Sequence, residues 1–316
     1  MVWFFIILAI IIAILIVVCF FVSNKLFVYA IVRKDKDGQV TREELEKQGA
    51  GEFADEILKS RAEFFNTQYR EVEITSYDGL KLVGLLYEAP HPKGTIILFH
   101  GYRSSPVNDF SIAKDFYKSL GLNVLMPYQR AHGKSEGMYI TFGIKERHDV
   151  HNWIEFINKT KYSQLPIFLS GLSMGCSTVL MSAGETFPKN VKLIIADCGF
   201  TSPYDIFEHI VKTTMKVPFK PVIPFFNIIC RRKAGFGVKD YSTVDAVKNC
   251  KIPVFFIHGE ADDFVPPEMS FKAYKACASE KYLLTVPEAT HALSFMMDKD
   301  TYKPTLKRLI SRYIAN

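Results

Sequence analysis

The sequence lacks several features that would assign it to common classes of protein. Its six cysteines form no C-x-x-C pair, which argues against a zinc site or a disulfide framework. Its net charge of +6 is dispersed without a block of like charges, so the composition gives no argument for nucleic-acid binding. It has no glycine-rich nucleotide loop, and its eight histidines are too scattered to form a ligand set. We therefore expect no metal and no organic cofactor.

The first 22 residues lack charged side chains altogether. They are almost entirely isoleucine, leucine, valine and phenylalanine, and about 20 apolar residues in a helix suffice to span the hydrocarbon core of a bilayer. A secretory signal is the alternative, but the segment has no basic n-region and no A-x-A-like cleavage site follows it. We expect residues 1–22 to form an uncleaved, single-pass anchor in the cell membrane.

Basic residues follow this segment, whereas only the α-amino group precedes it. They are Lys25, Arg33, Lys34, Lys36 and Arg42. The positive-inside rule therefore predicts that the rest of the chain lies in the cytoplasm. Unpaired cysteines agree with such a reducing compartment. The membrane is thus an expected partner, while the sequence leaves the oligomeric state open.

The remaining chain has the composition of a globular protein, with 48% hydrophobic and 23% charged residues overall. We expect residues 23–67 to form a helical connector, with a capping box at 41–44 and a break at 49–51. In residues 68–316, short apolar strands alternate with helices. The expected strands lie at 69–75, 81–87, 95–99, 123–126, 167–169, 191–196, 252–257 and 282–286. This pattern predicts an α/β fold with a mostly parallel sheet and helices on both faces.

Residues 200–244 interrupt the alternation. They are rich in phenylalanine, isoleucine and proline, contain no obvious strand, and are too long for an ordinary connection. They also directly follow the end of an expected strand. We expect an inserted lid of short helices over the site. The alternative is a loop packed on the core.

A Gly-Leu-Ser-Met-Gly turn at residues 171–175 lies between an apolar strand and a helix. It fits the G-x-S-x-G pattern, which lifts a serine hydroxyl above the end of a sheet. Both glycines are needed because strand and helix approach so closely that a Cβ at either position would clash. Ser173 is therefore the candidate nucleophile. A purely structural turn is the alternative interpretation.

A serine nucleophile needs a base within hydrogen-bond reach and an acid that orients the base. In hydrolases of this type the chain order is serine, acid, histidine. His291 follows the acid candidates and lies after the last strand, whereas His209 lies in the insertion and His258 precedes the acids. We therefore predict His291 as the base. The acid is Asp262 or Asp263, and the spacing after the preceding strand favours Asp262.

The developing oxyanion needs preformed donors. We predict the backbone N–H groups of Met174, directly after the nucleophile, and of Tyr102, in the loop after the strand at 95–99. Ligands of parallel sheets bind beyond the carboxyl ends of the strands. The polar residues expected at that edge, and so at one shared site, are His100, Arg130, Ser173, Asp197, His258 and Asp262.

Together these motifs resemble the α/β-hydrolase superfamily of serine hydrolases. Within it, the sequence is similar to bacterial membrane-anchored members grouped with the esterase-like and prolyl-oligopeptidase-like hydrolases. The resemblance runs from about residue 69 to the last residue and is carried by His100-Gly101, the R-x-H-G-x-S loop at 130–135, G-x-S-x-G at 171–175, H-G-x-x-D at 258–262 and His291. It implies the α/β-hydrolase fold and a Ser-His-Asp triad, with the R-x-H-G-x-S loop structural.

The expected function is a membrane-anchored serine hydrolase of the carboxylesterase or lipase-like kind. Its substrate would be an acyl or aromatic ester, since the insertion is rich in apolar side chains. A serine peptidase and an acyltransferase use the same triad and remain alternatives. A non-catalytic, membrane-tethered binding module is a further alternative, because a fold alone does not prove a function.

Overall fold

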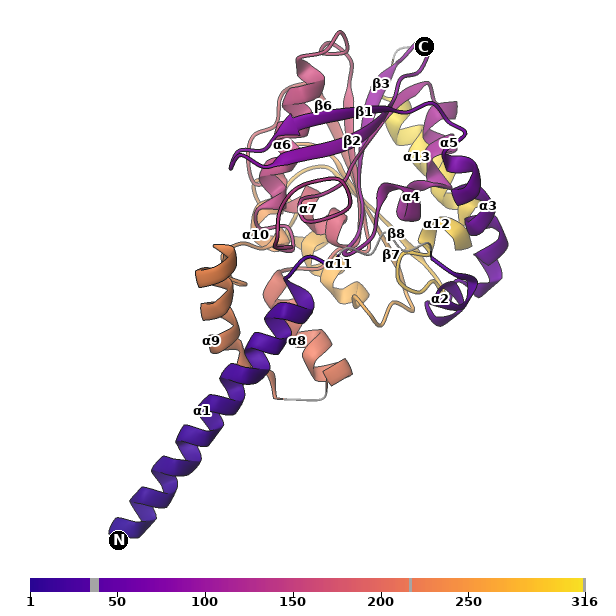
Figure 1. Cartoon of the computed structure of the whole chain (residues 1–316). Helices are drawn as coiled ribbons and strands as arrows, with labels where there is room; N and C mark the ends of the chain where they lie inside the picture. Colours follow the sequence, from indigo (N-terminus) through magenta and orange to yellow (C-terminus); the bar gives the residue numbers. More distant parts are fainter. Residues whose placement is uncertain (35–39, 216–217, 315–316) are drawn as a thin grey trace.

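A long apolar helix projects from an α/β domain (Figure 1). The computed structural model describes residues 1–34, 40–215 and 218–314, so Lys36 of the basic group lies outside it. Helix α1 (Val2–Ala30) is the one helix of the described chain long and apolar enough to cross a membrane. Residues 2–18 of this helix are exposed. The helix continues eight residues beyond the predicted end of the anchor at 22, into the segment expected as connector.

The domain is built on an eight-stranded sheet of order β1-β2-β4-β3-β5-β6-β7-β8. β1 pairs with β2 and β2 with β4 in antiparallel fashion, and all other neighbours are parallel. Every strand falls where the sequence predicts one. The strands are β1 (Arg70–Thr75), β2 (Lys81–Tyr87), β3 (Gly94–Phe99), β4 (Leu122–Pro127), β5 (Ile167–Leu172), β6 (Val191–Asp197), β7 (Val254–Gly259) and β8 (Lys281–Val286).

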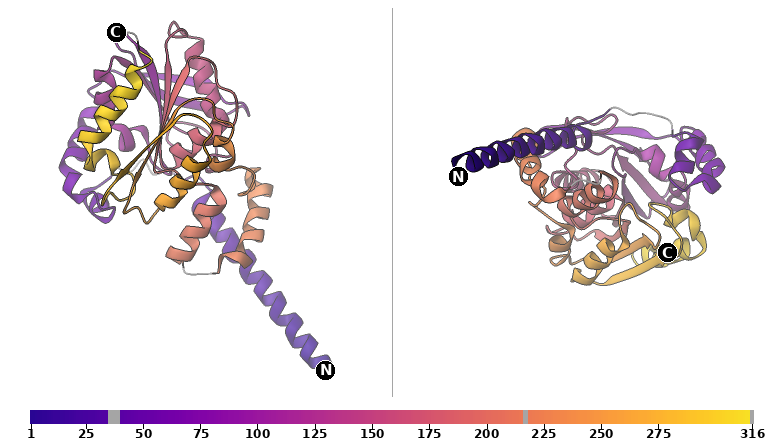
Figure 2. Two further views of the ribbon diagram at one scale, coloured as in Figure 1. Left: turned by 180° about the vertical axis from the view of Figure 1, so that it is seen from behind. Right: turned by 90° about the horizontal axis from the view of Figure 1, so that it is seen from below.

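Helices cover both faces of the sheet (Figure 2), as predicted. One face packs against side chains of α6 (Glu146–Asn158), α7 (Met174–Ser182), α10 (Thr243–Val247) and α11 (Pro267–Ala276). The other packs against α4 (Pro106–Phe110), α5 (Ala113–Ser119) and α13 (Lys299–Ser311), and the short α12 (Ser294–Met297) precedes α13. The segment between β3 and β4 forms two short helices, α4 and α5, which are separated at Ser111 and Ile112. At the division, the Ser111 carbonyl accepts hydrogen bonds from Ser60 Oγ and Lys114 Nζ.

The connector folds back onto the domain as α2 (Arg42–Lys47), a 3-10 turn η1 (Gly51–Phe53) and α3 (Ala54–Phe64). The predicted capping box is present, because Thr41 Oγ1 accepts from the Glu44 N–H and Glu44 Oε2 accepts from the Thr41 N–H. Leu45 and Ile57 pack against Leu293, in the segment that follows β8. The connector therefore reaches the carboxyl edge of the sheet.

The insertion consists of short helices, as expected: α8 (Pro203–Ile210), η2 (Val211–Met215), α9 (Phe219–Ile229) and η3 (Cys230–Ala234). Figures 1 and 2 show α9 beside the base of α1. Ser23 Oγ donates a 2.9 Å hydrogen bond to the Val222 carbonyl, and Phe27 is buried in one cluster with Phe226. The insertion therefore holds the last turns of α1 against the domain.

Candidate active site

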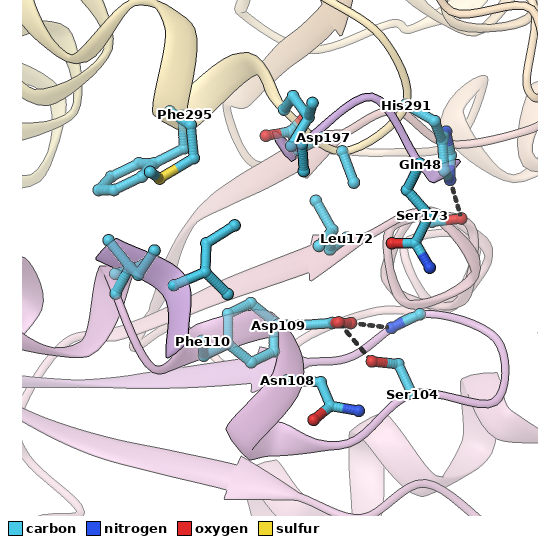
Figure 3. Close-up of a pocket in the computed structure, with 18 of the residues that line it drawn as sticks. Gln48, Ser104, Asn108, Asp109, Phe110, Leu172, Ser173, Asp197, His291 and Phe295 are labelled. Carbon is cyan, nitrogen blue, oxygen red and sulfur yellow. Dashed lines mark hydrogen bonds between the residues drawn. The ribbon is translucent and has the colours of Figure 1, made fainter. Parts of the chain in front are cut away.

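Ser173 occupies a sharp turn between β5 and α7 at the carboxyl edge of the sheet (Figure 3). Its φ of +54° lies in the left-handed region, which a non-glycine residue adopts only at a cost in strain. A Cβ added to Gly171 would collide with the backbone of Gly175, and a Cβ added to Gly175 would collide with the Phe99 carbonyl. The steric need for both glycines, predicted from the sequence, is confirmed.

A continuous chain of hydrogen bonds starts at the Ser173 hydroxyl. Ser173 Oγ lies 2.8 Å from His291 Nε2, and His291 Nδ1 lies 2.7 Å from Asp262 Oδ2. With the Nδ1 proton donated to the carboxylate, Nε2 is free to accept the serine proton. The structure thus brings together the three residues predicted as a triad, which the chain separates by 89 and 29 residues.

Asp262 is held by more than the candidate base. Its Oδ1 accepts from the N–H groups of Phe264 (3.1 Å) and Val265 (2.8 Å). Its Oδ2 also accepts from His258 Nε2 at 3.1 Å. Burial by itself would raise the pKa of the Asp262 carboxyl, but the hydrogen bonds from His258 and His291 outweigh it and lower the pKa to about 2. The carboxylate is therefore ionised at neutral pH.

The second acid candidate, Asp263, lines the cavity, but no side-chain hydrogen bond within the described residues joins it to Ser173 or His291. The Asp263 side chain is exposed, and its backbone carbonyl accepts from His209 Nε2 at 2.8 Å. His209 thus contacts the loop next to the site but not the reacting groups. Of the two acids that the sequence leaves open, the geometry selects Asp262.

The loop after β3 lies directly against the nucleophile. A Cβ on Gly101 would come within 3.5 Å of Ser173 Cβ. The Arg103 N–H donates to His132 Nε2 (3.0 Å), and the Ser104 N–H donates to the Gly101 carbonyl (3.3 Å). The Tyr102 N–H has no acceptor in the described part of the chain. This loop therefore leaves the predicted oxyanion donor available.

Asp109 anchors this loop, a role that was not predicted from the sequence. Its Oδ2 accepts from the Gly101 N–H at 2.6 Å, and its Oδ1 accepts from the Ser104 hydroxyl. Burial raises the pKa of the Asp109 carboxyl. The available signal was an aspartate in the first turn of the helix that follows the His-Gly loop, where a carboxylate can meet free backbone N–H groups.

A cavity of about 800 Å³ opens beside Ser173 and His291. The connector supplies part of its wall through Leu45, Gln48, Gly49 and Ile57. None of the described residues of the insertion lines it. The expectation that residues 200–244 cover the site therefore needs correction, because this segment packs against α1 and the connector takes the covering position. Nothing in the sequence distinguishes the two segments in this respect, since both are helical and partly apolar.

The other polar residues expected at the strand ends divide into two groups. Asp197 and His258 lie at the site, the former lining the cavity and the latter bonded to Asp262. Arg130 instead forms a buried pair with Asp149, at 2.7 and 2.6 Å, and contacts Asp78. These contacts agree with the structural role implied by the resemblance.

His100 is also structural. It is fully buried, accepts from the Gln129 N–H at Nε2 (3.0 Å) and donates from Nδ1 to the Gly101 carbonyl (2.8 Å). Burial lowers the pKa of this imidazole well below its usual value, so it is neutral. His100 thus braces the loop that carries Tyr102 and is not a second base.

One group of potential metal ligands lies within the described residues at this site. Cys198 Sγ, a carboxylate oxygen of Asp262 and a ring nitrogen of His291 lie within 4.8 Å of one another. Asp262 and His291 already bond each other, and burial raises the pKa of the Cys198 thiol well above its usual value. A protonated thiol is a poor metal ligand. The pair of Asp262 and His291 is therefore arranged for proton transfer, and the three residues together are poorly suited to hold a metal ion.

Comparison with known families matches residues 136–316, more than half of the chain, to the prolyl oligopeptidase family. The matched segment contains the serine turn, the acid loop and the histidine loop described above. The chain belongs to the prolyl oligopeptidase family. Its hydrogen-bonded residues Ser173, Asp262 and His291 follow the carboxyl ends of β5, β7 and β8, which lie at one edge of the sheet.

Relatives of this family member occur in bacteria and eukaryotes. The chain is 28% identical over 224 residues to uncharacterized protein YqkD of Bacillus subtilis, covering 70% of this chain and 73% of YqkD. It is 27% identical over 233 residues to protein bem46 of Schizosaccharomyces pombe, covering 72% of each. The esterase Pf2001 of Pyrococcus furiosus is similar in structure, with a TM-score of 0.65, 25% identity, and coverage of 79% and 93% of the two chains. The chain thus has the α/β-hydrolase fold, and these likenesses support hydrolase activity.

Proposed function

We propose that this protein is a membrane-anchored serine hydrolase that cleaves carboxylic esters through an acyl-enzyme. The observation that carries the proposal is the hydrogen-bonded chain from Ser173 Oγ through His291 to Asp262, with contacts of 2.8 and 2.7 Å. It starts at a strained serine beside a cavity of about 800 Å³. A strained nucleophile, an oriented base and an ionised acid are what acyl transfer requires.

In the proposed mechanism His291 Nε2 accepts the Ser173 proton as Oγ attacks the ester carbonyl carbon. The carbonyl oxygen becomes an oxyanion, and the N–H groups of Met174 and Tyr102 donate to it. The imidazolium, stabilised by Asp262, then gives its proton to the leaving alcohol oxygen, and the acyl-enzyme forms. A water molecule attacks the acyl-enzyme with the same base, releasing the acid and restoring the Ser173 hydroxyl.

Esters are the preferred substrate class because the cavity has extensive apolar walls. They include Leu45, Ile57, Phe110, Leu172, Leu293 and Phe295. Such walls suit an acyl chain or an aromatic ring. The family match supports a peptidase as the second candidate, since it is to the prolyl oligopeptidase family.

We also propose that α1 anchors the protein in a bilayer with the domain on the cytoplasmic side. Its residues 2–22 would span about 30 Å as a helix, the thickness of the hydrocarbon core. Lys25 and Lys34 follow this segment, and all six cysteines are free thiols. Both observations support the cytoplasmic orientation. We expect an uncleaved α1 in the membrane fraction, and a domain that external protease digests only after the cells are opened.

The deciding experiment uses the full chain in detergent micelles. It is offered p-nitrophenyl esters from acetate to palmitate and peptide p-nitroanilides, with Ser173→Ala as the control. We expect ester hydrolysis that Ser173→Ala loses by several orders of magnitude, and labelling of Ser173 by a fluorophosphonate. Preference for the anilides would favour the peptidase. A folded protein that neither reacts with the probe nor turns over any substrate would favour a non-catalytic binding module.

A further inference from the structure

One carboxylate in the cavity has no part in the proposed mechanism. Asp197 ends β6, is only 4% exposed, and lines the same cavity as Ser173. Its Oδ2 accepts a 2.9 Å hydrogen bond from the Tyr302 hydroxyl. Its Oδ1 has no hydrogen-bond partner within the described part of the chain. Asp262 already orients His291, so Asp197 is not needed as the acid.

Leaving a buried carboxylate oxygen unpaired is costly. Such groups are normally hydrogen-bonded, and an unpaired one destabilises the protein unless something else supplies a partner. Burial raises the pKa of the Asp197 carboxyl to about 6, which shows how poorly its charge is compensated. This unpaired oxygen therefore requires an explanation, and its position next to the nucleophile suggests one.

Asp197 lies next to Ser173 at the edge of the sheet and lines the same cavity. Its backbone carbonyl accepts from the Ser173 N–H at 2.9 Å, and it is paired in register with Leu172, the residue before the nucleophile. Neighbouring strands lie about 4.8 Å apart. Figure 3 shows Asp197 between Phe295 and the pair formed by Ser173 and His291. A group only a few bonds from the reacting carbonyl can therefore meet Asp197.

The surroundings of Asp197 are mixed in character. Hydroxyl-bearing side chains of Tyr117, Ser170 and Tyr302 line this region of the cavity together with the ring of Phe295. Tyr117, Ser170 and Tyr302 are themselves buried. A polar end inside a largely apolar cavity suits a ligand that is apolar along most of its length and carries one polar group.

We propose that Asp197 Oδ1 accepts a hydrogen bond from a hydroxyl group on the acyl part of the substrate. The proposal rests on the ester hydrolysis proposed above and names its substrate class: esters of hydroxylated acids, aliphatic or phenolic. The acyl part is assigned to the Asp197 region because it stays bound in the acyl-enzyme, while the alcohol leaves past the partly exposed His291. A hydroxyl is assigned in place of an ammonium because the apolar walls would desolvate a cation.

The test compares matched esters on the full chain in detergent micelles. The pairs are p-nitrophenyl hexanoate with its terminally hydroxylated counterpart, and phenylpropanoate with para-hydroxyphenylpropanoate. We expect kcat/KM to be about tenfold higher for the hydroxylated member of at least one pair, the effect of one buried hydrogen bond. Asp197→Leu should bring this ratio to about one, and the better-tolerated Asp197→Asn should lower it. Ile57→Val, which alters the apolar wall that the connector supplies, should preserve it.

Fluorophosphonate labelling of Ser173 separates this proposal from the one on which it rests. Equal kcat/KM for both members of each pair, in a wild type that labels and hydrolyses both, would overturn the hydroxyl subsite and leave the hydrolase intact. A ratio that survives in Asp197→Leu would do the same. A preference for the terminally amino-substituted hexanoate would show that the group recognised is a cation. A folded wild type that neither labels nor hydrolyses any ester would overturn both proposals.

Discussion

The choice between two adjacent aspartates allows a sharp test of the site. Asp262→Asn keeps the shape of the side chain but replaces a carboxylate acceptor with an amide that can donate to His291 Nδ1. The imidazole would then carry its proton on Nε2, which faces Ser173 Oγ at 2.8 Å, and could no longer accept the serine proton. We expect kcat to fall by about 10⁴, equivalent to about 5 kcal/mol of transition-state stabilisation.

The same substitution should also lower stability. The pKa of the Asp262 carboxyl is about 2 in the folded protein against an ordinary 3.8, so the ionised form stabilises the fold by about 2 kcal/mol. Because the folded pKa is depressed, this contribution is present above about pH 4 and is lost as the pH falls towards 2. Asp262→Asn should therefore unfold more readily at neutral pH, and the difference from wild type should shrink in acid.

Asp263→Asn is the matched control one residue away. Its side chain is exposed, so we expect kcat and the unfolding temperature to stay close to wild type. The assay is p-nitrophenyl ester hydrolysis by the full chain in micelles, with rates normalised to the Ser173 sites that react with a fluorophosphonate. An equal loss in Asp263→Asn, or an Asp262→Asn rate within tenfold of wild type, would refute the assignment of the acid.

The contacts of Asp197, Phe27 and Gly175 can each be tested by substitution. Asp197→Asn should remove the titration of this carboxyl. Since its folded pKa of about 6 lies above the ordinary 3.8, wild type should gain about 2 kcal/mol of unfolding free energy relative to the variant as the pH falls from 7 to 4. Phe27→Ala should lower the free energy of unfolding by about 3 to 5 kcal/mol, because this ring is buried between α1 and the insertion, whereas Phe20→Ala on the exposed part of α1 should change it little. Gly175→Ala should abolish folding or labelling by a fluorophosphonate, because its Cβ would overlap the Phe99 carbonyl.

Measurements of stability and labelling could contradict these three expectations. A pH-independent difference between wild type and Asp197→Asn, measured by chemical unfolding, would mean that the carboxyl is not perturbed. Equal thermal stability of Phe27→Ala and Phe20→Ala would mean that α1 does not dock on the domain. For the glycine turn, Gly79→Ala is the control, since open space surrounds that glycine and only its φ of +87° opposes a side chain. Comparable effects at both glycines would remove the steric argument.

Local patterns in the sequence were enough to predict the elements and the nucleophile. Strand positions follow from short apolar runs, and all eight lie where they were expected. The serine turn follows from the sterics of five consecutive residues, and the collision at Gly175 agrees. The capping box at Thr41 is equally local. These features depend on neighbours along the chain, which the sequence displays directly.

Tertiary structure decided what depends on contacts between distant segments. The sequence left Asp262 and Asp263 open because either could follow the strand, and only the position of His291 relative to that loop selects one. The sequence also led to the wrong segment over the cavity. Both the connector and the insertion 200–244 are helical and partly apolar, and apolar content does not reveal which surface a helix packs against. No role was predicted for Asp109 or for the unpaired oxygen of Asp197, since burial and hydrogen-bond partners arise only when strands and loops from across the chain converge at one edge of the sheet.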